Sequence, residues 1–254
     1  MCLIKYAFDE QRIATITFNR DEKRNAINEE MAGQILDRLE DAEKDDVRVV
    51  ILRANAGVNV WSAGHDVSEL NPFDLYSENP TLKLSRKIQS VPFPVIAMVE
   101  GSVHGGGVIL LLSADIVMAA ENADLAIASN KLGIPLSIDV HAYWLRVMGI
   151  HKAKELLFTA GVITAKDAYH AGLYNRVTNR SELEQVTKEL AQRITRCSPE
   201  AVAATKRQLN LIAAQSSISE EGRTDLAEQS SQVLQSLDTK ERIAAILKSL
   251  NGNR

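Results

Sequence analysis

The residues with the clearest chemical potential are three consecutive glycines, Gly105-Gly106-Gly107, which lead directly into the apolar run 108–112. A glycine loop that opens into a helix leaves backbone N–H groups unpaired at the positive end of the helix dipole. Such groups stabilise an anion or a developing oxyanion, and glycine permits close approach of a ligand. The stretch matches neither GxxxxGK[ST] nor GxGxxG, the two common phosphate loops. Alone, it is equally compatible with a tight strand-to-helix turn.

A second loop, Ser62-Ala63-Gly64-His65-Asp66, precedes the glycines by about 40 residues. Small residues there permit close passage of another segment.

The elements that position these loops follow from the hydrophobic pattern. Alternation predicts a hairpin of strands at 4–8 and 13–18, and apolar runs predict strands at 47–52, 95–99, 116–120 and 124–127. Asn28 as N-cap predicts a helix through Leu39, and a second helix is expected near 82–89. From about residue 140 the pattern is nearly all helical, with amphipathic stretches at 152–158, 183–194, 201–213 and 226–237 and a polar break at 216–221. This order predicts one α/β domain with a helical extension.

Composition excludes several classes of function. The 254 residues carry 29 Lys and Arg against 33 Asp and Glu, a net charge of −4, which argues against a nucleic-acid partner. No apolar run approaches the roughly 18 residues that span a bilayer, and the N-terminus lacks the pattern of a signal peptide. Two cysteines, Cys2 and Cys197, and five histidines without zinc-ligand spacing indicate neither a disulfide framework nor a metal site. We expect a soluble cytoplasmic protein without a membrane contact.

Taken together, the two loops resemble the crotonase superfamily, also called the enoyl-CoA hydratase/isomerase family. The resemblance covers most of the chain up to about residue 178 and includes residues 19–20, 25–28, 62–66, 100–101, 113–116, 131–135, 153–156, 158–159 and 163–165. It implies a crotonase (ClpP-like) α/β fold of repeated ββα turns in residues 1–195 and a C-terminal helical trimerisation region in residues 196–254. It also implies an acyl-CoA substrate, a homo-oligomer (a trimer or a dimer of trimers), and no cofactor besides the coenzyme A of the substrate.

The family mechanism rests on two backbone N–H groups that hold the thioester oxygen as it becomes an enolate. The resemblance places these donors at His65 and Gly106. The substrate-binding positions that we expect are Ala26, Ala63, Gly64, Asp66, Gly105, Ile109, Ser129 and Leu136.

The chain departs from the hydratases of this family at two positions. Where those enzymes carry a pair of glutamates, this sequence has Ile109 and Ser129. Isoleucine neither accepts a proton nor orients water, so ordinary hydration loses its acid/base pair. Loss of CO2 from a malonyl-type thioester makes the enolate without a base, and residues 62–70 and 98–103 most resemble a decarboxylase of the family. An apolar wall containing Ile109 and Leu136 would desolvate the substrate carboxylate.

We therefore expect a CoA-thioester lyase that decarboxylates a methylmalonyl-CoA or malonyl-CoA-like substrate. Leu136 stands where the similar decarboxylase has a tyrosine that acts on the carboxylate, so another residue performs this task or the reaction differs. The enolate then takes a proton from water or from His65, His104 or His141.

Asp139 is either the N-cap of a helix over 140–147 or the base of a double-bond shift. The alternatives are thus an enoyl-CoA isomerase or hydratase that uses Asp139, and an acyl-CoA-binding homologue without catalysis.

Overall fold

The computed structural model of the chain describes residues 2–69, 79–214 and 220–251. Its main sheet has the order β1-β2-β4-β7-β9-β12. The strands are β1 (Ile4–Phe8), β2 (Ile13–Phe18), β4 (Val49–Ala54), β7 (Val95–Val99), β9 (Ile116–Ala120) and β12 (Arg176–Thr178). The hairpin β1–β2 is antiparallel, and all the other neighbours pair in parallel.

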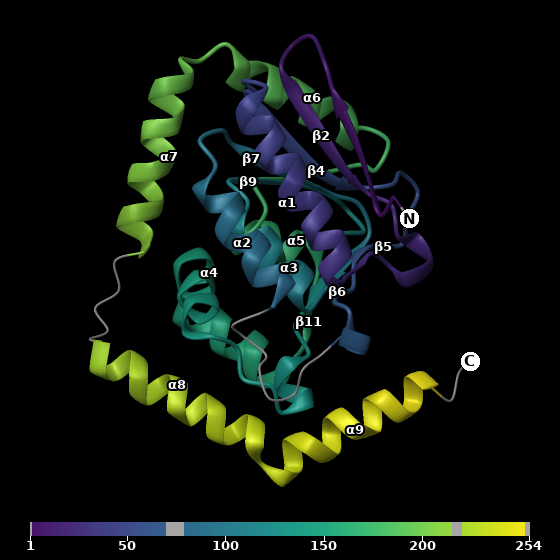
Figure 1. The fold of residues 1–254 in the computed structure, drawn as a ribbon, viewed down its shortest axis with the longest axis vertical. Helices are drawn as coiled ribbons and strands as arrows, with labels where there is room; N and C mark the ends of the chain where they lie inside the picture. The colour runs from purple at the N-terminus through teal and green to yellow at the C-terminus, as the bar shows by residue number, and fades with distance from the viewer. Residues whose placement is uncertain (1, 70–78, 215–219, 252–254) are drawn as a thin grey trace.

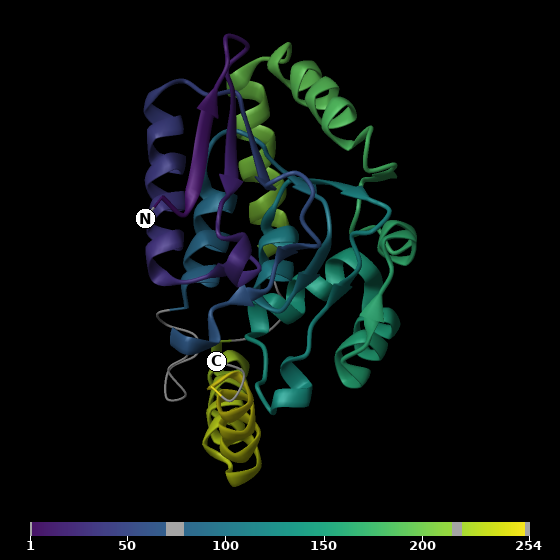
Figure 2. The same ribbon diagram turned by 90° about the vertical axis from the view of Figure 1, so that its right-hand side faces the viewer.

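Side chains that alternate along the central strands fill two layers of core. In β4, Val50 and Leu52 belong to the larger cluster, together with residues of α1 (Glu29–Lys44). Val49 and Ile51 point to the opposite face, where α6 (Leu183–Thr195) covers them. Figure 2 shows the strands between these two helices. Burial on both faces explains the continuous apolar runs of these strands.

Two smaller sheets bring together the segments that carry the predicted site. One has the order β11-β10-β8-β5 and contains β5 (Val60–Ser62), β8 (Ser102–His104), β10 (Leu125–Ala126) and β11 (Val162–Ile163). The other pairs β3 (Ala26–Ile27) with β6 (Gly64–His65) in parallel. Because β5 and β8 are neighbours, the residues that follow each strand emerge side by side.

The remaining helices flank this core. They are α2 (Pro80–Ser90), α3 (Gly106–Ser113), α4 (Ile138–Thr159), α5 (Ala165–His170), α7 (Pro199–Ala214), α8 (Glu220–Gln235) and α9 (Leu237–Asn251), with 3-10 turns η1 (Asp21–Lys23), η2 (Val67–Glu69) and η3 (Ser129–Leu132). In Figure 1, α7 runs along one side of the core, and α8 and α9 lie at the end nearest to β6 and β11. Within the described residues, no helix is both long and apolar enough to cross a membrane.

Most predicted elements are confirmed, including the hairpin, the strands at 95–99 and 116–120, and the Asn28 cap, whose side chain accepts from Met31 N at 3.0 Å. The strand predicted at 47–52 begins two residues later, because the amide of Val47 closes the end of α1 on Ala42 O. Two predictions are wrong in part: the loop at 62–66 contains the end of β5 and the whole of β6, and β11 and β12 interrupt the expected helical region. Most of the polar break at 216–221 lies outside the described residues.

Candidate active site

A cavity of about 270 Å³ lies where the two smaller sheets meet the first turns of α2, α3 and α4. It is lined by residues 63, 65 and 67, by 79, 81 and 82, by 104–106 and 109, by 126–129, and by 132, 134–137 and 140. Eight of the twelve residues predicted to be catalytic or substrate-binding are among them, namely Ala63, His65, His104, Gly105, Gly106, Ile109, Ser129 and Leu136. The other four, Ala26, Gly64, Asp66 and Asp139, do not line the cavity.

The amides of His65 and Gly106 lie next to each other at this cavity. A Cβ atom added to Gly106 would lie 3.2 Å from His65 N, and one added to Gly64 would lie 2.4 Å from Gly106 N. Gly64 also has a φ of +85°, so only glycine fits this crossing of β6 over the start of α3. Gly106 is the first residue of α3, and its N–H therefore has no acceptor within the helix. The arrangement presents two neighbouring backbone donors to a bound oxygen.

A buried ion pair fixes the strand that carries the first donor. Arg20 Nη1 donates to Asp66 Oδ2 at 2.6 Å and to Ala26 O at 2.7 Å, and so links the ends of β3 and β6. Burial raises the pKa of Asp66, but hydrogen bonds from Ser68 and Arg20 outweigh it and hold this pKa below its usual value. Asp66 and Ala26 therefore support the site from behind and do not line the cavity.

The His65 ring contacts the beginning of α2. Its Nδ1 lies 3.3 Å from Asn79 Nδ2. Burial lowers the pKa of His65, and the negative charges of Glu69, Asp66 and Glu29 reverse only part of this shift. The ring is therefore neutral at pH 7.

His104 ends β8 at the edge of the cavity, and its Nε2 lies 3.0 Å from Ser102 Oγ. Burial and the nearby charge of Arg24 both lower the pKa of His104. A second neutral imidazole thus stands beside the glycine loop.

The opposite wall is apolar and comes from α3, β10 and the segment before α4. Ile109 and Leu136 both line it, as expected. Ser129 Oγ is buried there without a hydrogen-bond partner among the described residues. No Asp, Glu, Lys or Arg is among the described residues that line the cavity. A base of the carboxylate type is therefore missing from this part of the wall.

Asp139 is not among the residues that line the cavity. It is exposed in the first turn of α4, and the N-cap position of that helix is Ser137, so the prediction of Asp139 as the cap is wrong. The helix starts earlier than the apolar pattern indicates, directly after Pro135-Leu136. His141, whose pKa burial lowers, is half-buried and lies outside the lining as well.

Sequence reasoning missed Asn79 and Thr81, which line the cavity from the start of α2. A signal was present: Asn79-Pro80 is a typical N-cap followed by proline in the first helical position. It predicts the helix start at residue 80, two residues before the first apolar position used to place the helix.

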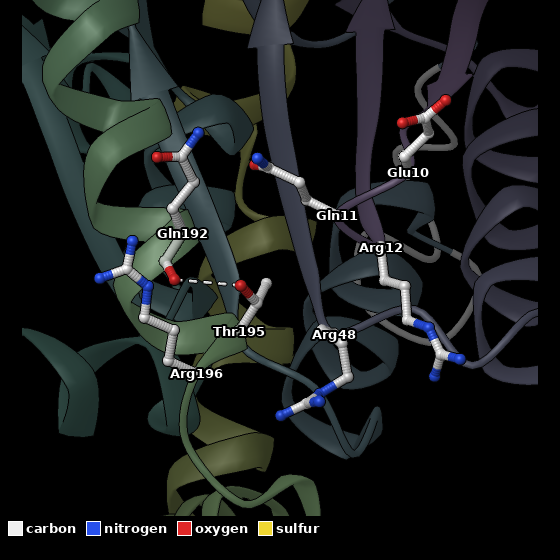
Figure 3. A pocket seen from close by; sticks show the side chains of 7 residues that line it. All are labelled: Glu10, Gln11, Arg12, Arg48, Gln192, Thr195 and Arg196. Atoms are coloured by element: carbon white, nitrogen blue, oxygen red, sulfur yellow. Dashed lines mark hydrogen bonds between the residues drawn. The ribbon is translucent and has the colours of Figure 1, made fainter.

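A second hollow of about 270 Å³ lies at the amino ends of β2 and β4 and is lined by Glu10, Gln11, Arg12, Arg48, Gln192, Thr195 and Arg196 (Figure 3). Arg12 pairs with Asp46, and Arg48 donates to Cys197 O. The segments that build the candidate site leave from the carboxyl ends of β2 and β7 instead. None of the predicted site residues lines this hollow.

Known proteins with similar sequences and structures show the family of this chain. A family model described as enoyl-CoA hydratase/isomerase matches residues 9–249. The methylmalonyl-CoA decarboxylase of Escherichia coli (strain K12) is 36% identical over 204 residues, which are 79% of this chain and 78% of that protein. The short-chain-enoyl-CoA hydratase of Clostridium acetobutylicum is 31% identical over 205 residues, again 79% and 78% of the two proteins.

A solved structure of a methylmalonyl-CoA decarboxylase in complex with 2-nitronate-propionyl-CoA has a TM-score of 0.93 to this chain at 32% identity. The match covers 97% of this chain and 96% of the other. The sequence-based expectation of a crotonase fold is thus confirmed, and the chain belongs to the enoyl-CoA hydratase/isomerase family.

Proposed function

We propose that this protein decarboxylates a malonyl-type CoA thioester, such as methylmalonyl-CoA or malonyl-CoA. The observation that carries the proposal is the pairing of two backbone donors, His65 N and Gly106 N, with a cavity whose described lining holds no carboxylate. Such a site can stabilise an enolate oxygen. Among the residues that the structure describes, its lining offers no carboxylate to activate water or to remove a proton.

In the proposed reaction the bond between the α-carbon and the carboxylate carbon breaks, and CO2 leaves. The electron pair of that bond passes into the thioester and forms an enolate, whose oxygen accepts hydrogen bonds from the His65 and Gly106 amides. A proton then adds to the α-carbon, either from water or from the His65 ring. Coenzyme A takes part only as the carrier of the acyl group.

The apolar wall favours the loss of charge from the substrate. A carboxylate placed against Ile109 and Leu136 exchanges water for hydrocarbon, and its charge disappears as CO2 forms. Leu136 has no polar group to hold the carboxylate, so polar contacts must come from other lining residues, such as His65, Thr81 and Ser129.

Similarity to known proteins supports decarboxylation and also points to a second candidate function. Two solved structures of methylmalonyl-CoA decarboxylases hold 2-nitronate-propionyl-CoA and 2S-carboxypropyl CoA, which are coenzyme A derivatives that carry an anionic nitronate or carboxylate group. The 31% identity to an enoyl-CoA hydratase favours hydration as the second candidate. The described lining lacks a carboxylate that would activate water for hydration.

Incubation of the purified protein with methylmalonyl-CoA, malonyl-CoA and crotonyl-CoA distinguishes the candidates. Decarboxylation predicts that the first two thioesters lose the mass of CO2 while crotonyl-CoA stays unchanged. Hydration of crotonyl-CoA alone would contradict the proposal. Binding of all three esters without turnover would favour an acyl-CoA-binding homologue.

We also propose that residues 196–254 form contacts between subunits of a trimer or of a dimer of trimers. Large apolar side chains on α7 and α9 support this proposal, because Leu209, Leu211, Ile212 and Leu237 are each more than half exposed in the single chain. Exposed apolar surface of this kind is typical of protein interfaces.

A further inference from the structure

The side chain of Asn79 has a fixed orientation, because its oxygen caps α2. Asn79 Oδ1 accepts hydrogen bonds from Thr81 N at 3.0 Å, from Thr81 Oγ1 at 2.6 Å and from Leu82 N at 3.3 Å. A backbone N–H donates only, so the atom that faces these amides must be the carbonyl oxygen. The NH2 group of the amide therefore points away from the helix.

That NH2 group faces the His65 ring, with 3.3 Å between Asn79 Nδ2 and His65 Nδ1. An amide nitrogen donates and does not accept. His65 Nδ1 must then be the acceptor and carry no proton. In a neutral imidazole the proton consequently sits on the other nitrogen, Nε2.

We infer that Asn79 is a positioning residue that holds His65 in the tautomer protonated on Nε2, so that the ring presents an N–H donor at the wall of the cavity. Both residues line that cavity. The donor suits a negatively charged oxygen of the acyl group, namely the carboxylate of the substrate or the oxygen of the enolate. This part of the inference rests on the proposed decarboxylation, whereas the tautomer itself does not.

Negative charges around the ring oppose its neutral state only in part. The charged groups that act on it are Glu69 from η2, Asp66 from the end of β6 and Glu29 from the start of α1. Glu29 in turn pairs with Lys83 of α2. Asp66 is neutralised by Arg20, and Glu69 accepts from the amide of Glu29. Burial nevertheless dominates and lowers the pKa of His65, so the ring stays neutral near pH 7.

Two substitutions separate the contact with the ring from the helix cap. Asn79→Asp and Asn79→Ser both keep an oxygen at a position where Asp and Ser are good N-caps. Aspartate replaces the NH2 donor with an acceptor, and it should move the ring proton to Nδ1 and raise the pKa of His65. Serine is too short to reach the ring and should leave a mixture of tautomers. Asn28→Asp, the same change at the cap of α1, controls for the added negative charge.

The first readout is 15N NMR of the histidine rings in the full-length protein without substrate. We expect His65 to be protonated on Nε2 in the wild type and in Asn28→Asp, and on Nδ1 in Asn79→Asp. Protonation on Nδ1 in the wild type, or the same tautomer in the wild type and Asn79→Asp, would overturn the inference. Circular dichroism shows whether each variant is folded.

The second readout is turnover of methylmalonyl-CoA. Loss of one hydrogen bond to a charged group should lower kcat about 10- to 100-fold in Asn79→Asp, with a smaller loss in Asn79→Ser. An unchanged kcat in Asn79→Asp would refute a role of the tautomer in turnover. A wild type that shows the expected tautomer but decarboxylates neither malonyl ester would refute the proposed function alone.

Discussion

The contact between Gly106 and its neighbours determines whether the two amides can act together. A methyl group at residue 106 would lie 2.8 Å from Thr81 Cγ2 and 3.2 Å from His65 N, so the segments must move apart. We expect Gly106→Ala to lower kcat/KM for methylmalonyl-CoA about 100- to 1,000-fold, which is the usual effect of losing one oxyanion donor. Steady-state kinetics on the folded variant measures this.

Gly33→Ala is the matched control, because an added Cβ there meets nothing within 4 Å in the middle of α1. It should keep the activity and raise the free energy of unfolding by about 0.5–1 kcal/mol. Equal activity of Gly106→Ala and the wild type would show that these amides do not hold the reacting oxygen.

The lowered pKa of His65 also predicts how stability depends on pH. Burial lowers this pKa in the folded state, so below pH 6.5 the unfolded chain binds more protons than the folded protein. The contribution of the neutral His65 ring to the free energy of unfolding is therefore complete above about pH 6.5. It is lost as the pH falls toward the pKa that His65 has in the folded protein.

Urea unfolding of the wild type and of His65→Gln at about pH 7.5 and pH 5.5 tests this. The variant should lose less stability between the two pH values. A larger loss in the variant would mean that the pKa of His65 is raised by folding.

At the scale of elements, a lysine attaches α7 to the core. Lys206 is the one buried residue of α7, all of whose residues the structure describes. Its Nζ donates to Ile88 O at 2.8 Å, to Phe93 O at 2.9 Å and to Asp115 Oδ2 at 2.7 Å. Burial raises the pKa of Asp115 and lowers that of Lys206, so desolvation of the two charges outweighs their attraction.

Removal of the lysine alone should therefore be strongly destabilising. We expect Lys206→Met to lower the free energy of unfolding by about 3–5 kcal/mol, because it leaves Asp115 charged and buried. Lys206→Met combined with Asp115→Asn should lose less, since no charge remains. Lys188→Met, which breaks the exposed pair with Glu184, should change stability by less than about 1 kcal/mol. Equal effects of Lys206→Met and Lys188→Met in urea unfolding would contradict this account.

Hydrophobic periodicity and N-cap residues predict the long helices and strands well, but they do not predict the short strands. The two-residue strands β3 and β6 have no periodicity to detect, and they exist because a hydrogen-bonded loop around Arg20 and Asp66 joins distant segments. The apolar pattern likewise does not locate the start of α4, since Ser137 occupies the N-cap position without a side-chain hydrogen bond. Such features depend on tertiary contacts that local sequence does not encode.

The same limit applies to the site. The two glycine-containing loops were predicted from residue type and resemblance, and the structure brings them together. Asn79 has no signal of function in the sequence, because its contact with His65 arises only when α2 packs beside β6.

For the whole molecule, the exposed apolar residues predict self-association. The protein should sediment as a trimer or hexamer at micromolar concentration. Leu211 and Ile212 on α7 are 63% and 65% exposed, and replacing both with glutamate should shift the protein to smaller species without loss of helix content. A wild type that sediments as a monomer would contradict the proposed assembly, and circular dichroism checks the fold of the variant.

The most direct test of the central claim is the fate of three thioesters followed by mass spectrometry in one experiment. The two neighbouring amides and a described lining without a carboxylate predict that methylmalonyl-CoA and malonyl-CoA lose CO2, that crotonyl-CoA gains no water, and that Gly106→Ala loses this activity. Hydration of crotonyl-CoA, with both malonyl esters left intact, would contradict the account.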